Sequence, residues 1–241
     1  WLDRPLSIAG RIALKNPQSS HPRLKLVDFK RPVAVLPNLA IHLNRAMNDG
    51  VALNAQTDLL PICGMDEHMD TDTFLQILAN ETDEKPEDIL CFDLSVYHYA
   101  EPVRTGFSGD MFMAPRIDNI SSVQACLTGL IEANPSDGIS VAVLFDHEEI
   151  GSRSKNGANG NLLSYTLERI CNALNISRER FLQSLVHSYY LSLDVAHAIH
   201  PAHPEKSDIT SAMPLNRGFA IKASAKHAYC SDDAVSYTHL R

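Results

Sequence analysis

The chain contains 241 residues, 44% of them hydrophobic and 21% charged, so it can bury a sizeable core as one large domain or two modest ones. Its 21 Lys and Arg residues and 29 Asp and Glu residues give a formal net charge of −8. This charge leaves no broad basic face for a polyanion, which argues against a nucleic-acid partner. The longest apolar run, residues 139–145, is far shorter than the roughly 20 residues of a membrane-spanning helix, and we expect no membrane partner.

The five cysteines are scattered and form no C-x-x-C pair, in a chain too long to need disulfide bonds for stability. We interpret them as reduced thiols, which predicts a cytoplasmic protein. The chain begins at Trp1 and not at a methionine, so we expect the natural N-terminus to lie upstream.

The first hundred residues carry short apolar runs separated by prolines, a pattern that predicts strands and bends. Residues 31–37 and 38–43 are two such runs. One helix is predicted over 71–81, because its apolar residues fall on a single stripe. Either Asp70 or Thr71 can cap its N-terminus.

Residues 90–96 alternate between apolar and polar side chains, which is typical of a half-buried strand. From about Val103 the pattern changes, because helices with 3.6-residue spacing now alternate with short apolar strands. We therefore predict two domains, a β-rich domain over 1–102 and an α/β domain over 103–241.

The predicted α/β domain contains helical stripes within 123–131 and 163–174, and a third helix that begins after the cap residue Ser177. Between the first two helices, residues 139–145 are apolar on both faces. This pattern predicts a central strand that helices cover on each side.

An acidic motif, Asp146-His-Glu-Glu-Ile-Gly-Ser152, follows that strand directly. In open α/β sheets, ligands bind beyond the carboxyl ends of the strands. Adjacent carboxylates there repel each other unless a cation neutralises them or one binds a proton. Neighbours on an extended segment point to opposite sides, so Glu148 and Glu149 can differ in role, one binding a metal and the other acting as a base. The alternative is a solvated acidic loop.

Two further apolar segments end in an aspartate: residues 189–194 end at Asp194 and residues 111–118 end at Asp118. Three strand ends that carry carboxylates can converge on one crevice, and such oxygen ligands suit zinc, manganese or cobalt in hydrolytic sites. An aspartate that bridges two metals would form the centre of this site. Asp118 or Asn119 can alternatively cap the helix that follows.

Other motifs have the wrong spacing or context. His197, His200 and His203 form an H-x-x-H-x-x-H series, but nearby prolines would break a helix, so we do not expect three histidine ligands. Residues 151–158 lack the spacing of a P-loop and are interpreted as a flexible loop. Residues 106–110 lack the G-x-S-x-G spacing of a serine hydrolase.

Three motifs resemble those of the aspartyl aminopeptidase family of metallopeptidases: Phe145-Asp-His-Glu-Glu-Ile-Gly-Ser152, Pro115-Arg-Ile-Asp-Asn119 and Asp194-Val-Ala-His-Ala-Ile-His-Pro201. Residues 1–11 and 37–43 also resemble family segments. The resemblance therefore covers nearly the whole chain, with several motifs in the family's order.

The resemblance implies a zinc-aminopeptidase-like sheet flanked by helices, as an incomplete catalytic domain, and a β-rich domain devoted to oligomerisation. It implies Asp118 as the ligand that bridges two metals, and Glu149 and Asp194 as ligands to single metals. Glu148 would be the general base that deprotonates the attacking water. The two divalent cations are expected to be zinc, with cobalt or manganese as alternatives.

The resemblance also implies that His197, Lys222 and Tyr229 line the substrate pocket, and that His42 reaches a neighbouring subunit's active site. Lys222 can pair with an acidic substrate side chain, although it can equally be an ordinary solvated lysine. The partners expected from this resemblance are short peptides with an acidic N-terminal residue and further copies of the chain in a large homo-oligomer.

The family's two metal-binding histidines lie upstream of the segment that matches Trp1 and beyond the one that matches Tyr229, so we expect the chain to be a central fragment. Ala202 replaces the family's usual Asn, which alters the expected substrate fit. The predicted function is a metal-dependent aminopeptidase that releases N-terminal Asp or Glu by metal-activated water. The alternatives are a related two-metal hydrolase with another substrate, and a non-catalytic assembly subunit or inactive fragment.

Overall fold

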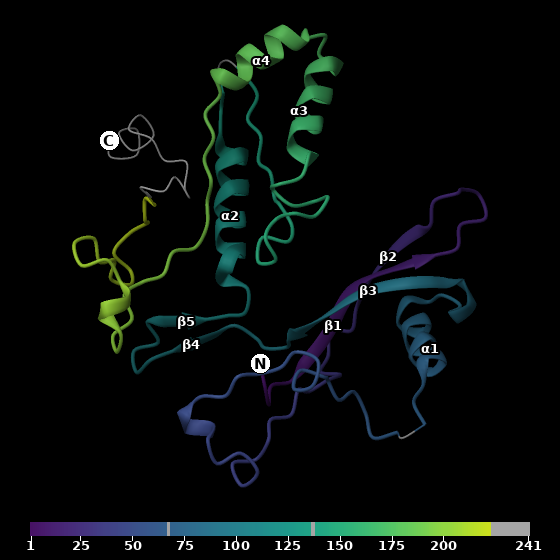
Figure 1. Ribbon diagram of the computed structural model, residues 1–241. Coiled ribbons are helices and arrows are strands. Elements are labelled where there is room, and N and C mark those ends of the chain that lie inside the picture. Colours follow the sequence, from purple (N-terminus) through teal and green to yellow (C-terminus); the bar gives the residue numbers. More distant parts are fainter. Residues whose placement is uncertain (67, 136–137, 223–241) are drawn as a thin grey trace. The chain divides into compact units, whose positions relative to one another are not determined.

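The computed structural model describes residues 1–66, 68–135 and 138–222. Figure 1 shows a mixed α/β chain that divides into two compact units, one of Trp1–Pro115 and one that begins at Arg116. Residues 103–115 thus lie in the first unit, whereas the sequence analysis assigned them to the second domain. No helix in the described part of the chain has the length and hydropathy to cross a membrane.

The first unit is built on a three-stranded antiparallel sheet in the order β2-β1-β3. The central strand β1 spans Leu6–Leu14, and its neighbours are β2, Arg23–Asp28, and β3, Ile89–His98. The strand predicted over 90–96 is therefore confirmed as β3. Because β2 and β3 pair only with β1, both are edge strands of this sheet.

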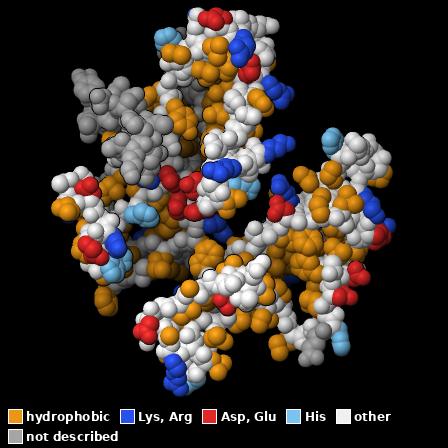
Figure 2. All heavy atoms as spheres, in the orientation of Figure 1, with side chains coloured by type: hydrophobic (Ala, Val, Ile, Leu, Met, Phe, Trp, Pro, Cys, Tyr) orange, Lys and Arg blue, Asp and Glu red, His pale blue; other side chains and the backbone are white. Residues whose placement is uncertain are grey.

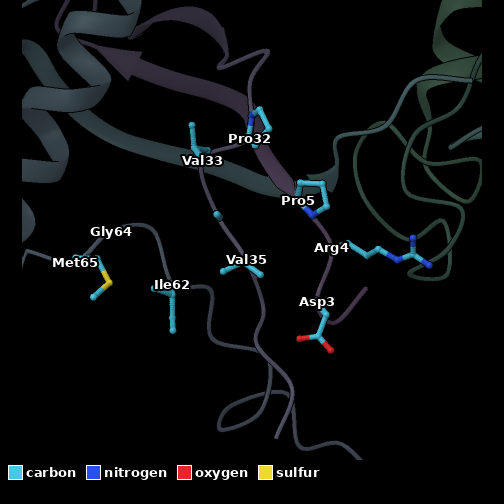
Figure 3. Close-up of a pocket in the computed structure, with 10 residues that line it drawn as sticks. Asp3, Arg4, Pro5, Pro32, Val33, Val35, Ile62, Gly64 and Met65 are labelled. Atoms are coloured by element: carbon cyan, nitrogen blue, oxygen red, sulfur yellow. The ribbon is translucent and has the colours of Figure 1, made fainter. Parts of the chain in front are cut away.

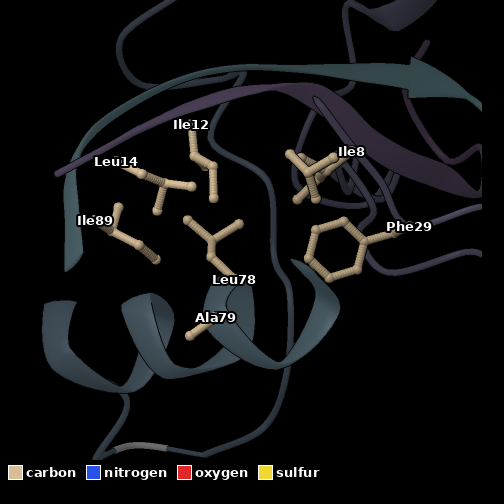
Figure 4. Packing of buried hydrophobic residues seen from close by; sticks show 8 residues of the cluster. Ile8, Ile12, Leu14, Phe29, Leu78, Ala79 and Ile89 are labelled. Carbon is tan, nitrogen blue, oxygen red and sulfur yellow. The ribbon is translucent and has the colours of Figure 1, made fainter. Parts of the chain in front are cut away.

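Helix α1, Thr71–Thr82, packs on one face of this sheet, and it confirms the helix predicted there. The Asp70 carboxylate accepts a hydrogen bond from the Thr73 backbone N–H at 2.8 Å, which caps the helix as predicted. Figure 4 shows Leu78 of α1 between the apolar side chains of β1 and β3. The buried core consists of Ile8, Ile12, Leu14, Val27, Phe29, Leu78, Ala79 and Ile89.

The face of the sheet opposite α1 carries exposed leucines. Leu24 and Leu26 of β2 lie on this face and are 60% and 82% exposed. Phe92 of β3 faces α1 and packs edge-to-face on Phe74, with ring centroids 5.5 Å apart, yet remains 44% exposed. Phe92 stays partly exposed because α1 has only 12 residues and covers only part of the face on which Phe92 lies. Figure 2 shows hydrophobic side chains on the visible surface of this unit.

The proline-separated runs give bridges and turns, not full strands. Residues 34 and 35 form isolated bridges to Leu6 and Ile62, and residues 38–43 contain a turn. Short 3-10 helices occur at Met47–Asp49 (η1) and Pro86–Asp88 (η2). A two-stranded hairpin of β4, Val103–Thr105, and β5, Met111–Met113, completes the unit.

The described residues of the second unit form three α-helices, all of which the sequence analysis predicted: α2, Ile117–Glu132; α3, Leu162–Ala173; and α4, Arg178–Val186. The Ser177 hydroxyl accepts a hydrogen bond from the Arg180 backbone N–H at 3.2 Å and caps α4, as expected. A 3-10 helix, η3, spans Pro204–Lys206.

The strands predicted over 139–145 and 189–194 are absent, because no described residue from Arg116 onward lies in a β-strand. Residues 139–145 are exposed or half-buried, although the sequence analysis predicted a central strand covered on both faces. A strand requires neighbours for its backbone N–H and C=O groups, and the described residues of this unit supply none. The predicted sheet with helices on each side is therefore wrong for the described part of this unit.

Candidate metal and catalytic site

Asp118 and Asp194 come together in the second unit from segments far apart in the chain. Asp118 lies at the start of α2, where its own backbone and that of Asn119 are non-helical, so the regular helix begins at Ile120. Asp194 lies in an extended segment after α4. The Asn119 side-chain amide donates a hydrogen bond to Oδ1 of Asp194 at 3.3 Å. The Asp118 carboxyl lies close enough to influence the Asp194 pKa by a side-chain hydrogen bond.

Four groups around the Asp194 carboxylate determine its ionisation. Partial burial raises the pKa of Asp194, but hydrogen bonds from the Val195 backbone N–H and the Asn119 amide lower it. The positive charge of Lys222 and the Asp118 side chain lower it further, and the net pKa lies below the usual value. The Lys222 Nζ atom lies 3.9 Å from Asp194 Oδ2 and donates to the Val195 carbonyl at 3.4 Å. Asp194 is thus held as a carboxylate.

Glu148 and Glu149 lie in the loop of residues 146–160, which we call the acidic loop. The Ser152 N–H donates to the His147 carbonyl and the Gly151 N–H to the Glu148 carbonyl, both at 2.9 Å. This pair of bonds is the Schellman motif that ends many helices. It requires a left-handed residue at Gly151, whose φ is +95°. Both glutamate side chains lie on this turn and are exposed, so the extended segment assumed in the sequence analysis is wrong at these two residues.

The rest of the acidic loop folds back on this turn. The Asp146 N–H donates to the Asn156 carbonyl at 3.1 Å, and the Asn159 N–H to the Ser152 carbonyl at 3.0 Å. Gly157 is buried, and a Cβ atom there would lie only 2.2 Å from the Ser152 carbonyl oxygen. The sequence analysis interpreted residues 151–158 as a flexible loop, but these contacts close it on itself.

A divalent cation fits a pair of adjacent aspartate side chains, because their oxygen atoms are ligands that zinc and manganese accept. The structure brings Asp118 and Asp194 together in this way. Among the described residues, however, no group of three or more His, Cys, Asp or Glu side chains is arranged to hold a metal. The glutamates of the acidic loop thus form no metal-binding group with this pair of aspartates in the structure.

The other residues singled out from the sequence are distributed as follows. Lys222 is half-buried beside Asp194, whereas His197 is exposed in the segment that follows Asp194. His42 is exposed in the first unit. Tyr229 lies outside the described residues.

Sequence reasoning considered Asn119 only as a helix cap and missed its contact with Asp194, and it missed Ser154 altogether. The Ser154 hydroxyl lies 2.6 Å from Nδ1 of His147. No spacing rule indicates this contact, because it depends on how the loop closes. Asn119 follows a candidate ligand directly, and amides beside ligands often orient them, so this signal was available.

The pocket shown in Figure 3 lies in the first unit. Its walls include Pro5, Pro32, Val35 and Ile62, and Asp3 is also among its lining residues. None of the candidate site residues lines it, so the pocket adds nothing to the chemistry of the second unit.

The comparisons with known proteins agree with the motifs. The family model described as "Aminopeptidase I zinc metalloprotease (M18)" matches residues 1–239. A probable M18 family aminopeptidase 2 of Clostridium novyi is 43% identical over 238 residues, which are 98% of this chain and 55% of that protein. A protein of the same name from Pseudomonas entomophila is 38% identical over 246 residues, covering 100% of this chain and 56% of that protein. The chain thus spans about half the length of the curated relatives it matches.

Solved structures also match the fold. The structure of a complex of Ape4 and Nbr1 contains a chain with a TM-score of 0.84 and 29% identity, over 98% of this chain and 49% of the other. Yeast aminopeptidase 1 matches with a TM-score of 0.70 and 26% identity, over 90% of this chain and 50% of its own. With a family model that matches residues 1–239, the chain belongs to the M18 family of aminopeptidase I zinc metalloproteases.

Proposed function

We propose that the protein is a zinc-dependent aminopeptidase that releases N-terminal aspartate or glutamate from short peptides. The observation that carries this proposal is the meeting of Asp118 and Asp194 in a chain of the M18 family. These carboxylates lie in two of the three motifs on which the family resemblance rests. The third motif carries Glu148 and Glu149, side by side on an exposed turn.

In this proposal Asp118, Glu149 and Asp194 hold two zinc ions, with Asp118 between them. Cobalt or manganese can replace zinc at such oxygen ligands. Bound zinc polarises a scissile carbonyl and lowers the pKa of a water molecule toward neutrality. The Asn119 amide keeps Asp194 in one orientation, as partners of metal ligands commonly do.

Glu148 is the proposed general base. Its carboxylate takes a proton from the attacking water and then returns a proton to the leaving amine. The Schellman turn supports this assignment because it presents Glu148 and Glu149 as separate exposed side chains. One glutamate can therefore bind metal while the other faces the substrate.

The proposed preference for acidic residues rests on Lys222. Its ammonium group lies beside the paired aspartates and is 35% exposed, so a substrate carboxylate near the site would meet a positive charge. We further propose that His197 and Tyr229 line the substrate pocket and that His42 reaches the active site of a neighbouring subunit.

We propose that the β-rich part, residues 1–102, mediates assembly into a large homo-oligomer. The exposed Leu24 and Leu26 on the sheet face opposite α1 support an interface in this part of the chain. A cytoplasmic location is also proposed. The cysteines of the described part, Cys63, Cys91, Cys126 and Cys171, are free thiols, in keeping with a reducing compartment.

The experiment that tests the proposed function is Glu148→Gln in the complete protein. We expect the variant to keep its zinc but to lose about 10²–10⁴-fold in kcat on an aspartyl peptide, because general-base catalysis contributes about that factor. Glu132→Gln, an exposed residue at the end of α2, is the matched control. Normal turnover by Glu148→Gln would show that Glu148 is not the base.

A substrate panel separates the proposed function from its alternatives. Aspartyl and glutamyl peptides should be cleaved faster than leucyl peptides, and acylated substrates should not be cleaved. Faster cleavage of leucyl or acylated substrates would identify a related two-metal hydrolase. A zinc-loaded complete protein that cleaves no member of the panel would favour the non-catalytic alternative.

A further inference from the structure

Ser154 makes the closest side-chain contact within the acidic loop, and the proposed function gives it no role. Its hydroxyl lies 2.6 Å from Nδ1 of His147, and both side chains are half-buried. The other ring nitrogen of His147, Nε2, lies 3.6 Å from Oδ2 of Asp146. The Nε2 contact is longer than a hydrogen bond, so the Ser154 hydroxyl is the hydrogen-bond partner that holds the imidazole.

His147 is also the first residue of the Schellman turn. Its carbonyl accepts the Ser152 N–H, and its own N–H donates to Asp146 Oδ1 at 3.0 Å. The residue adopts a left-handed backbone, with φ of +62°, which is uncommon for a residue other than glycine. A contact that restrains the His147 side chain therefore also restrains the start of the turn, directly before Glu148.

We propose that Ser154 is a positioning residue, which acts through His147 to hold Glu148 and Glu149 in the orientation that metal binding and proton transfer require. This inference rests on the proposed function of these two glutamates. Ser154 itself touches neither zinc nor substrate in this proposal. Its hydroxyl forms a hydrogen bond with His147, the residue directly before Glu148.

The packing of the loop makes such a link effective. The Asn159 N–H bonds to the Ser152 carbonyl, and buried Gly157 packs against the same carbonyl with no room for a Cβ atom. The backbone of the second half of the loop thus packs closely against the end of the turn. The hydrogen bond from Ser154 connects this backbone to the His147 side chain. Loss of the hydroxyl would remove that connection and leave the backbone hydrogen bonds of the loop unchanged.

The experiment compares Ser154→Ala with Ser154→Thr in the complete protein. Ser211→Ala is the matched control, because Ser211 is exposed, lies outside the acidic loop, and the hydrogen bond described for it comes from its backbone N–H. For Ser154→Ala we expect faster amide hydrogen exchange over residues 146–152 and weaker binding of zinc alone, by roughly 10-fold. We expect kcat to fall by a similar factor, with KM little changed. Ser154→Thr keeps a hydroxyl and should restore all three.

Two results would overturn the inference. One is Ser154→Ala with the exchange, zinc affinity and kcat of the wild type. The other is faster exchange with unchanged zinc affinity and kcat, which would leave Ser154 a purely structural role. If the wild-type protein cleaves no acidic peptide, the proposed function fails, but the exchange and zinc measurements still decide whether Ser154 positions the turn.

Discussion

Asn119 and Asp194 are 75 residues apart in the sequence, yet the Asn119 amide nitrogen lies 3.3 Å from Oδ1 of Asp194 and donates a hydrogen bond to it. Asn119 also directly follows Asp118, so one residue links the two aspartates. The arrangement resembles the way in which outer partners orient metal ligands in many proteins. It gives the paired aspartates a fixed geometry that the sequence alone does not reveal.

Asn119→Ala should therefore weaken zinc binding by roughly 10-fold, since loss of such a partner commonly costs 10- to 100-fold. Asn119→Asp should lower zinc affinity less at neutral pH, because the added carboxylate contributes negative charge near the metal. Asn172→Ala, at an exposed position of α3, is the control. Zinc titration by calorimetry measures all three, and unchanged affinity in Asn119→Ala would exclude the orienting role.

Lys222→Met should change substrate preference more than metal binding. The substitution keeps an unbranched side chain that is one atom shorter and removes the charge that lies 3.9 Å from Asp194 Oδ2. We expect kcat/KM for aspartyl peptides to fall about 10-fold relative to leucyl peptides, a loss of about 1.4 kcal/mol of discrimination. Lys206→Met, on the exposed 3-10 helix η3, is the control.

The alternative for Lys222 predicts a different result. If the ammonium group acts only on Asp194, the ratio of the two kcat/KM values stays constant while zinc affinity changes. Measurement of both quantities on the same preparation therefore distinguishes a contact with substrate from a contact with the ligand.

Glu84 should make the stability of the protein depend on acidic pH. Hydrogen bonds from Arg23 and Lys25, each at 2.8 Å, lower the pKa of Glu84 from 4.5 to about 2. Because the folded protein binds this proton more weakly than the unfolded chain does, the stabilisation is complete above pH 4.5 and is lost as the pH falls toward 2. Glu84 thus links the end of α1 to β2 most strongly at neutral pH.

Urea unfolding of the wild type and of Glu84→Gln, followed by circular dichroism, tests this dependence. The difference in unfolding free energy should be constant from pH 7 to about pH 5 and should shrink between pH 4.5 and 2. Glu87→Gln, an exposed residue of η2, is the control for loss of one negative charge. A difference that does not vary with pH would contradict the role of the ion pairs.

Leu78→Ala should destabilise the first unit. The side chain is fully buried between α1 and the sheet, and such truncations cost about 2–5 kcal/mol through lost burial and the cavity that remains. Leu215→Ala is the matched control, because Leu215 is 71% exposed, lies outside the part proposed to assemble, and its truncation should cost less than about 0.5 kcal/mol. Equal losses in the two variants would contradict the role of Leu78 in the core.

The helices were predictable because their determinants are local. The cap of α1 at Asp70 and that of α4 at Ser177 lie within three residues of the N–H groups that they bind. The apolar stripe of a helix likewise repeats within one or two turns. Strand β3 was predicted for the same reason, from an alternation within ten residues.

The predicted strands at 139–145 and 189–194 show the limit of this reasoning. Their apolar composition favours burial, but a strand exists only when another strand supplies its backbone hydrogen bonds. That condition depends on residues distant in the sequence, and the described residues of the second unit do not meet it. The contact between Ser154 and His147 could not be predicted for the same reason, because it forms only when the loop closes on itself.

The amino-acid sequence by itself singled out Asp118, Glu148, Glu149 and Asp194 as candidate site residues, because carboxylates next to apolar runs are costly without a cation or a proton. The tertiary structure alone decided which of them meet. It pairs Asp118 with Asp194 and holds both glutamates on a separate Schellman turn. The physical reason is that residue type is encoded locally, whereas proximity depends on how distant segments of the chain fold against one another.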